Sequence, residues 1–369
     1  MARSIFFYTD SRELGGAEKA MLMLLEQLDR ARWAPALLLD AGGDTGPLEE
    51  RAAALEVPSR RVAAMPLGLA GARNGAALAR QLRREQPALF HAHLSWPLAA
   101  KWALAAAVAA RVPSVATVQL IPAMALERSS ALQLRLLARG VGRYIAVSEA
   151  IAGELAERFR YQAEKIEVVY NAVELDRFGG PAPAGLRAEL SDDPAAPLVL
   201  TAARLDEQKG HDVLLRAAVA LPEVRFALAG DGPLRAQLEA EAARLGVAGR
   251  IKFLGRREDV PQLLAACDVF ALPSLYEGSS LAVLEAMAAR RAVVSSAIGG
   301  TAELIADGVD GVLVAPGDDA ALATALQRLV GDAALRERLG AGARERAEHF
   351  GSAAMGRRVE GIYADLLDE

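Results

Sequence analysis

Short runs of apolar residues alternate with longer stretches of helical pattern along the whole chain. Most of these runs are continuously apolar, which is typical of strands buried on both faces, as in a parallel sheet covered by helices. The stretches between them are rich in alanine, so we expect numerous helices there. The predicted strands are 4–9, 34–39, 89–91, 115–118, 144–147 and 166–169, and then 198–202, 225–229, 252–254, 269–272, 293–296 and 312–314.

The two series of strands predict an α/β protein with two doubly wound, Rossmann-like parallel-sheet domains. Residues 178–197, FGGPAPAGLRAELSDDPAAP, are rich in Pro, Gly and Asp and read as a linker. We therefore expect one domain over 1–175 and a second over 195–350. In two-domain α/β enzymes the ligand binds at the carboxyl ends of the strands, so an interdomain cleft is the expected site.

Composition narrows the class of protein. Apolar residues make up 53% of the chain and charged residues 24%, as in soluble globular proteins. The single cysteine, Cys267, lies in an apolar run and is expected to be a small buried hydrophobe in a reducing compartment. No signal peptide is visible, and the apolar segment 98–110 is interrupted by Lys101 and too short to span a bilayer. We expect a cytoplasmic protein, and its net charge of −5 argues against nucleic acid as a partner.

The stretch 275–288, LYEGSSLAVLEAMA, combines a loop carboxylate, a helix start and a second carboxylate. A helix that begins near Ser280 leaves unpaired N–H groups at its start, and these favour anions. Carboxylates accept hydrogen bonds from sugar hydroxyls and are poor neighbours for phosphate. We expect Glu277 and Glu285 to bind hydroxyls. The residues expected to bind phosphate between them are Gly278, Ser279, Ser280 and Leu281.

Two other loops follow predicted strands and suit phosphate. Gly15 and Gly16 have no Cβ, so backbone can approach a phosphate closely at the start of the next helix; a plain turn is the alternative. The loop is not GxGxxG, so no dinucleotide cofactor is indicated. Arg204 offers a planar fork for a diphosphate and Lys209 a point charge. Such preorganised cations would stabilise negative charge on a leaving nucleotide.

Together these motifs resemble the retaining glycosyltransferases of family GT4, which have the GT-B fold. The family signature of two Glu separated by seven residues stands here as Glu277 and Glu285, within EGSSLAVLEAMA. The loop LGGAE at 14–18, the string ARLDEQKG at 203–210 and the turn LAGDGPL at 228–234 match as well. Weaker matches at 169–173, 299–305 and 307–311 extend the resemblance over nearly the whole chain.

The resemblance implies transfer of a sugar from a nucleotide-diphosphate sugar, a UDP- or GDP-sugar, with retention of configuration and without a metal or other cofactor. The acceptor would be a glycan, a lipid-linked molecule or a small molecule, in cell-envelope or exopolysaccharide biosynthesis. Glu277 would contact the donor sugar, Glu285 the ribose, and Arg204 and Lys209 the diphosphate. The last segment, 351–369, would cross back to the first domain. The other implied donor-binding residues are Gly15, Gly16, Gly230, Asp231, Phe253 and Leu254, and for Asp231 a structural role is equally expected.

One position departs from the family pattern. Many GT4 members carry a His after the strand that corresponds to 115–118, and here Gln119 stands in its place. Gln can hydrogen-bond a sugar hydroxyl but cannot exchange a proton. His93, at the end of the strand 89–91, is the other candidate for a catalytic role near the sugar. His91 and His93 could also suggest a metal, but no further Cys/His cluster or Asp-x-Asp motif accompanies them.

Arginines cluster in the first domain without acids between them, and a solvated helix face is the simpler explanation. The other is contact with an anionic membrane or a charged acceptor, which would place the protein peripherally on the inner face of the membrane. The clustered residues are Arg60, Arg61, Arg73, Arg80, Arg83 and Arg84, and then Arg128, Arg135 and Arg139 on one helix stripe.

Two alternatives to a transferase stay open. A GT-B nucleotide-sugar epimerase or hydrolase would need no sugar acceptor, but it would need acid and base groups, and Gln119 speaks mildly against it. A catalytically silent nucleotide-sugar-binding partner would bind the donor without turnover. Arg204, Lys209 and the pair Glu277 and Glu285 favour activity, whereas Gln119 leaves this choice open.

Overall fold

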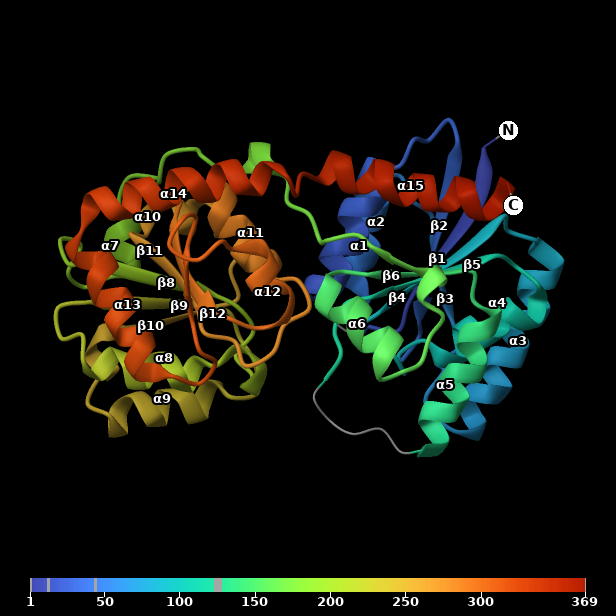
Figure 1. Ribbon diagram of the computed structural model, residues 1–369, viewed down its shortest axis with the longest axis horizontal. Coiled ribbons are helices and arrows are strands. Elements are labelled where there is room, and N and C mark those ends of the chain that lie inside the picture. The colour runs from blue at the N-terminus through green and yellow to red at the C-terminus, as the bar shows by residue number, and fades with distance from the viewer. Residues whose placement is uncertain (1, 12–13, 43–44, 123–127, 369) are drawn as a thin grey trace. The chain divides into compact units, whose positions relative to one another are not determined.

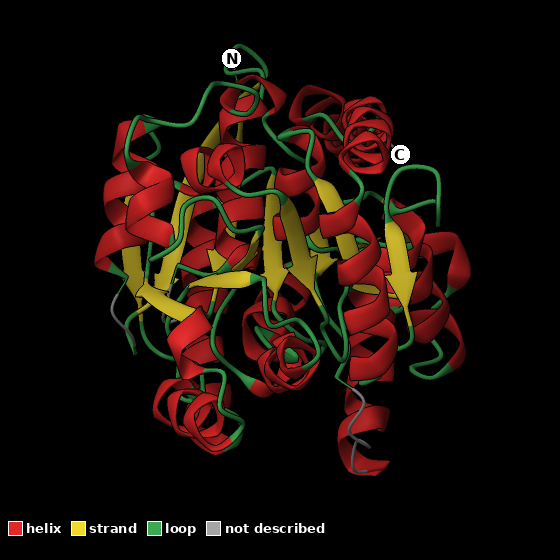
Figure 2. Cartoon of the chain, turned by 90° about the vertical axis from the view of Figure 1, so that its left-hand side faces the viewer, coloured by secondary structure: helices red, strands yellow, loops and turns green. Residues whose placement is uncertain are grey.

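The computed structural model describes residues 2–11, 14–42, 45–122 and 128–368 (Figure 1). The chain divides into two compact units, which are Met1–Ala172 with Ser352–Glu369, and Val173–Gly351. Each unit contains one sheet whose strands are all parallel, with helices around it (Figures 1 and 2). This is the predicted architecture of two Rossmann-like domains.

The sheet of the first unit has the strand order β3-β2-β1-β4-β5-β6-β7. Its strands are β1 (Arg3–Thr9), β2 (Trp33–Asp40), β3 (Ser59–Val62), β4 (Leu89–Leu94), β5 (Ser114–Val118), β6 (Arg143–Ala146) and β7 (Ile166–Val168). Its helices are α1 (Gly16–Gln27), α2 (Gly46–Ala54), α3 (Leu69–Glu85), α4 (Lys101–Ala110), α5 (Arg128–Gly140), α6 (Glu149–Glu157) and α15 (Ser352–Asp368).

The central strand β1 shows why its apolar run is continuous. Successive side chains of a strand point to opposite faces of the sheet. Phe6 and Tyr8 pack into one core cluster, which includes residues of α3, α4, α5 and α6. Ile5 and Phe7 pack into the other, with residues of α1, α2 and α15. Both faces of this sheet are therefore covered, as the apolar pattern predicts.

The segment after residue 351 packs against the first unit as α15, along α1 (Figure 1). Tyr363 is fully buried and makes an edge contact with Trp33, with ring centroids 5.5 Å apart. Gly356 lies against Gln27 so closely that an added Cβ would be 2.6 Å from the Cβ of Gln27. The helix is thus part of the first unit's core.

The sheet of the second unit has the order β10-β9-β8-β11-β12-β13. Its strands are β8 (Leu198–Ala202), β9 (Arg225–Ala229), β10 (Ile251–Gly255), β11 (Val269–Leu272), β12 (Ala292–Ser296) and β13 (Val312–Val314). Its helices are α7 (Leu186–Leu190), α8 (His211–Val219), α9 (Arg235–Arg244), α10 (Val260–Ala266), α11 (Leu281–Ala288), α12 (Gly299–Leu304), α13 (Asp319–Gly331) and α14 (Ala333–Glu348). Cys267 is buried and free, as predicted.

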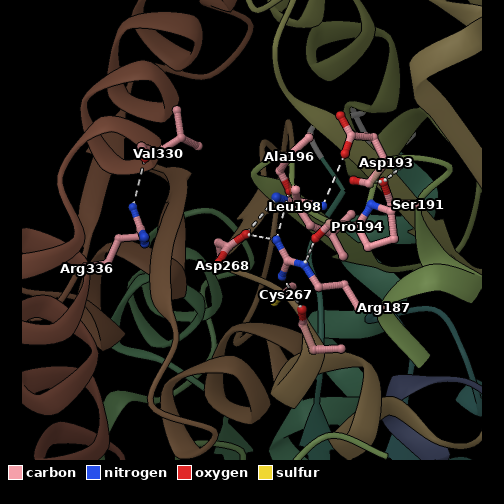
Figure 3. Close-up of polar contacts among 12 residues, drawn as sticks. Arg187, Ser191, Asp193, Pro194, Ala196, Leu198, Cys267, Asp268, Val330 and Arg336 are labelled. Carbon is pink, nitrogen blue, oxygen red and sulfur yellow. Dashed lines mark hydrogen bonds and ion pairs between the residues drawn. The ribbon is translucent and has the colours of Figure 1, made fainter. Parts of the chain in front are cut away.

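The segment interpreted as a linker belongs instead to the second unit. It contains α7, whose Arg187 is the centre of a polar cluster (Figure 3). The Arg187 guanidinium donates to Asp268 Oδ2 at 2.6 Å and to the carbonyls of Pro194, Ala196 and Ala266. The same Asp268 oxygen accepts from the backbone N–H of Leu198 at 2.8 Å. These bonds fix the segment to the start of β8.

The short edge strand β3 is missing from the predicted strands because its sequence is SRRV and only Val62 is buried. Its two arginines are not a free basic patch, which corrects the expectation for this part of the cluster. Arg60 pairs with Glu85 at 2.5 Å and Arg61 with Glu49 at 2.7 Å. Acids that are distant in sequence therefore neutralise these residues.

Candidate active site

In the loop after β8, the carboxylate of Asp206 joins the side chain of Arg204 to the backbone of Lys209. Arg204 donates from Nε to Asp206 Oδ2 at 2.6 Å, while its side chain stays 60% exposed. Asp206 Oδ1 accepts from the backbone N–H of Lys209 at 3.3 Å and so caps the 3₁₀ turn Glu207–Lys209. The backbone carbonyl of Arg204 contacts Nε2 of the buried His211 at 3.0 Å. This loop is therefore held by its own side chains at the carboxyl end of the strand.

Glu277 lies in the loop after β11, the strand beside β8, and three side chains hold its carboxylate. Lys209 Nζ lies 2.5 Å from Oε1, and Ser274 Oγ donates to the same oxygen at 2.9 Å. Gln208 Nε2 donates to Oε2 at 3.3 Å. The side chain of Glu277 is only 7% exposed and that of Lys209 19%. Glu277 and Lys209, which are expected to bind the sugar and the diphosphate of a donor, thus form a mostly buried ion pair.

The close approach of the two loops depends on Gly210. This residue has φ +63°, and a Cβ there would lie 2.0 Å from the carbonyl oxygen of Pro273. A second link is the backbone bond from the Leu275 N–H to the Gln208 carbonyl, at 2.7 Å. Only glycine fits at this contact. It therefore allows the two loops to approach each other closely enough for the ion pair to form.

The helix after Glu277 starts where the sequence predicts. Ser280 is the N-cap of α11, and its Oγ accepts from the Val283 N–H at 3.4 Å. Ser279 is buried and Leu281 begins the helix. Glu285 follows in the second turn and is half-buried. The helix therefore directs its N-terminus, which favours anions, to the stretch that begins with Gly278.

Gly230 and Asp231 lie at the end of β9, next to the Arg204 loop. Gly230 has φ +151°, and a Cβ there would be 1.9 Å from the carbonyl oxygen of Ala203. The Asp231 carbonyl accepts from the Leu205 N–H at 3.0 Å, while its exposed side chain bonds the following N–H. These contacts give the turn a structural function, and donor binding by Gly230 and Asp231 stays a prediction.

Phe253 and Leu254 lie on the edge strand β10 and are half-buried. The Arg235 guanidinium reaches the Phe253 carbonyl at 3.5 Å. Gly230 donates to the Gly255 carbonyl at 2.8 Å, which joins this strand end to the β9 turn. The predicted donor-binding residues of this unit thus share the carboxyl edge of one sheet.

In the first unit, Gly15 and Gly16 are exposed at the start of α1. The buried Glu18 accepts from the Gly15 N–H at 3.0 Å and from Thr9 Oγ1 at 3.3 Å. Burial raises the pKa of Glu18, although its hydrogen bonds act in the opposite direction. The carboxylate of Glu18 therefore ties the glycine loop to the end of β1.

His93 lies on β4 between Thr9 of β1 and Thr117 of β5. It is 3% exposed, and neither ring nitrogen has a partner among the residues that the structure describes. Burial lowers the pKa of His93 to about 3, so its ring is neutral near pH 7. The adjacent ring of His91, with its centroid 4.4 Å away, is fully buried and bonded to Tyr363 and Thr117.

Gln119 follows β5 at the same edge of the sheet. Its Oε1 accepts from Asn171 Nδ2 at 2.8 Å, and its backbone N–H donates to the Leu94 carbonyl at 2.9 Å. Asn171 is buried and therefore fixes the Gln119 amide. At this position the structure places an oriented amide and no titratable group.

The described residues contain no group of three or more His, Cys, Asp or Glu side chains that could hold a metal ion. None of the helices in the described ranges combines the length and apolar character that crossing a bilayer requires. Several residues that position the site were not predicted from the sequence, because nothing in the local sequence shows which side chain or backbone group each of them contacts. These residues are Asp206, Gln208, Ser274, Glu18 and Asn171.

Comparisons with known proteins agree with this fold. Residues 14–177 match the sequence family Glycosyltransferase Family 4, and residues 186–346 match Glycosyl transferases group 1. A D-inositol 3-phosphate glycosyltransferase of Salinispora tropica is 34% identical over 62% of this chain and 52% of its own length. The lipopolysaccharide core biosynthesis glycosyltransferase LpsE of Rhizobium meliloti is 39% identical over 42% of this chain and 45% of its own length. The chain thus spans about half the length of these curated relatives.

The solved structure of Alr3699/HepE from Anabaena, in complex with UDP and glucose, superimposes with a TM-score of 0.86 and 26% identity. The match covers 98% of this chain and 100% of that chain. The two sequence families together take in most of both units. The chain therefore belongs to the GT4 family of glycosyltransferases, with the GT-B fold.

Proposed function

We propose that the protein is a retaining glycosyltransferase that uses a nucleotide-diphosphate sugar and needs no metal ion. The observation that carries this proposal is the ion pair of Lys209 and Glu277 beside the start of α11. It brings a cation from the loop after β8 to a carboxylate that directly precedes the N-terminus of α11, and this arrangement suits a diphosphate linked to a sugar. The solved relative that holds UDP and glucose supports a UDP-sugar as donor.

In the proposed reaction the bond between the anomeric carbon and the β-phosphate oxygen breaks. The acceptor oxygen forms the new bond to that carbon on the same face of the sugar, and its proton goes to the departing phosphate oxygen. Arg204, Lys209 and the N-terminus of α11 stabilise the charge that develops on the nucleotide diphosphate. Glu277 accepts hydrogen bonds from the sugar, and Glu285 from the ribose.

The acceptor of the proposed reaction is a glycan, a lipid-linked molecule or a small molecule, bound by the first unit. The relative named for the lipopolysaccharide core supports a role in cell-envelope biosynthesis, and the relative named for inositol 3-phosphate supports a small-molecule acceptor. We place the proposed reaction in the cytoplasm. Gln119 is the observation that favours a second candidate, a nucleotide-sugar-binding partner without turnover. A measurement of product formation from a bound donor distinguishes a transferase from a binding partner without turnover.

Thermal unfolding with UDP, GDP, ADP and their sugar conjugates, with and without EDTA, tests the donor class. A ligand at 100 times its Kd adds about 2.7 kcal/mol to stability. We expect a shift from one nucleotide family, unchanged by EDTA and lost in Lys209→Ala. A shift that EDTA abolishes would contradict metal independence, and no shift with any nucleotide would contradict the proposed donor site.

A further inference from the structure

A cavity of about 160 Å³ in the first unit is lined by three arginines. Arg135 and Arg139 come from α5, and Arg160 lies between the end of α6 and the start of β7. All three are exposed, whereas the neighbouring Ala138 and Tyr161 are buried in the wall of the cavity. The complete lining is Arg135, Ala138, Arg139, Arg160, Tyr161 and Gln162.

The three guanidinium groups form no ion pair or side-chain hydrogen bond within the described part of the chain. The carbonyls at the end of α5 would be the natural partners of Arg135 and Arg139, since a helix C-terminus favours cations. Lys165 occupies them instead, because its Nζ donates to the carbonyls of Arg139 and Val141 at 2.8 and 2.9 Å. Three arginines that line one cavity favour a phosphate oxyanion, which guanidinium groups bind bidentately.

The cavity is remote from the candidate site of the same unit. Helices in this fold run antiparallel to the strands they cover, so the C-terminal ends of α5 and α6 lie at the amino edge of the sheet. Gly15, His93 and Gln119 follow or end strands at the carboxyl edge. A ligand in the cavity would therefore not occupy the donor or acceptor position.

We propose that this cavity is a second anion site, which binds a phosphate group. The group is supplied either by free phosphate or by the headgroup of a lipid. Leu132 and Leu136 lie on α5 at helical spacing from Arg135 and Arg139, and they are 57% and 53% exposed. Apolar side chains beside a phosphate site suit an amphiphilic ligand. The site is independent of the proposed transfer reaction.

The decisive variant is Arg160→Gly, because Arg160 has φ +57°, a conformation that glycine adopts more readily than arginine. The substitution removes one guanidinium without a backbone penalty. Arg111→Gly is the matched control, since Arg111 is an exposed arginine of the same unit with φ +59° and does not line the cavity. Both variants lose one positive charge and gain the same backbone freedom.

Binding of inorganic phosphate is measured by thermal shift and calorimetry at constant ionic strength. All variants are made in a Lys209→Ala background, so that phosphate at the donor site contributes little. We expect Arg160→Gly to weaken phosphate binding about tenfold or more, as loss of a charge-assisted hydrogen bond does, while Arg111→Gly binds normally. Equal binding by the two variants, or no binding by their parent, would overturn the proposal.

Sedimentation with phosphatidylcholine vesicles, with and without phosphatidic acid, distinguishes the two sources. A lipid ligand predicts pelleting that requires phosphatidic acid and is lost in Arg160→Gly but kept in Arg111→Gly. If free phosphate is the ligand, the protein should bind inorganic phosphate but should not pellet with either kind of vesicle. Pelleting that is equal in both variants, together with equal phosphate binding, would assign any membrane contact to another surface.

Discussion

The ammonium nitrogen of Lys209 lies 2.5 Å from Oε1 of Glu277, although the sequence assigns these residues to different parts of a ligand. From the sequence motifs we expect Lys209 to bind the phosphate and Glu277 to bind the sugar. In the structure each is the other's counter-ion, with little exposure to solvent. A bound diphosphate would therefore share Lys209 with Glu277, so the two residues should act as one unit in binding the donor.

We predict that Glu277→Ala and Lys209→Ala each lower kcat/KM by roughly 100-fold or more, as loss of one preorganised charge does elsewhere. Circular dichroism should show that both variants stay folded. Glu241→Ala and Arg244→Ala are matched controls, because these residues form a surface pair on the same unit. Near-normal turnover in both site variants would refute the site.

The same pair should also show non-additive stability. Removing either partner leaves a mostly buried charge without its counter-ion, which costs about 1–3 kcal/mol, whereas the double variant leaves neither charge behind. We expect urea unfolding to give a coupling free energy of at least about 0.5 kcal/mol. Additive losses would show that the ion pair does not persist in solution. The exposed pair Glu241 and Arg244 should show little coupling.

His93 predicts a pH dependence of stability. Its folded pKa of about 3 is below its ordinary value of about 6.5, so the unfolded chain binds the proton more readily. The stabilisation is complete above pH 6.5 and is lost as the pH falls toward 3, by about 1.4 kcal/mol per pH unit.

Unfolding free energies of wild type and His93→Gln, measured between pH 7 and 4.5, test this slope. The variant should lose less stability than wild type as the pH falls, with a slope smaller by about 1.4 kcal/mol per unit. The exposed His349→Gln controls for the loss of a histidine as such. Parallel curves for wild type and His93→Gln would mean that His93 titrates normally in the folded protein.

Gly230→Ala should destabilise the second unit by about 1–3 kcal/mol. The added Cβ would meet the Ala203 carbonyl oxygen at 1.9 Å, and φ +151° disfavours any side chain. Because the displaced segment carries Arg204, nucleotide binding should weaken as well. Gly249→Ala is the control, since its Cβ would have no neighbour within 4 Å. An unchanged melting temperature in Gly230→Ala would show that this contact relaxes readily.

Continuous apolar runs were enough to predict twelve strands and the two parallel sheets, since strands buried on both faces have a distinct pattern. They could not predict β3, where an exposed edge strand carries two arginines whose partners come from other elements. They also could not show that residues 178–197 belong to the second unit. A single arginine, Arg187, makes the four bonds to the surrounding residues that fix this stretch.

In the candidate site, too, local features could be predicted and contacts between distant residues could not. The sequence placed the start of α11 at Ser280 because a cap and a helical pattern are local features. It could not assign Gln208 and Ser274 to Glu277, since these contacts join loops from different strands. Nor could it show that Gln119 is fixed by Asn171, which is 52 residues away. Helix starts and caps can thus be predicted from the sequence, whereas hydrogen bonds between loops of different strands cannot.

The packing of α15 has a consequence for synthesis on the ribosome. Tyr363 bonds His91 and lies against Trp33, so the core formed by residues 1–172 lacks part of its cover until Val173–Gly351 has also been made. The second unit, in contrast, is continuous in the chain and can complete its core as soon as it leaves the exit tunnel. Of the two units, the one whose translation begins earlier is therefore completed later, and the surface that α15 covers in the folded protein is the one that a chaperone would need to shield in the meantime.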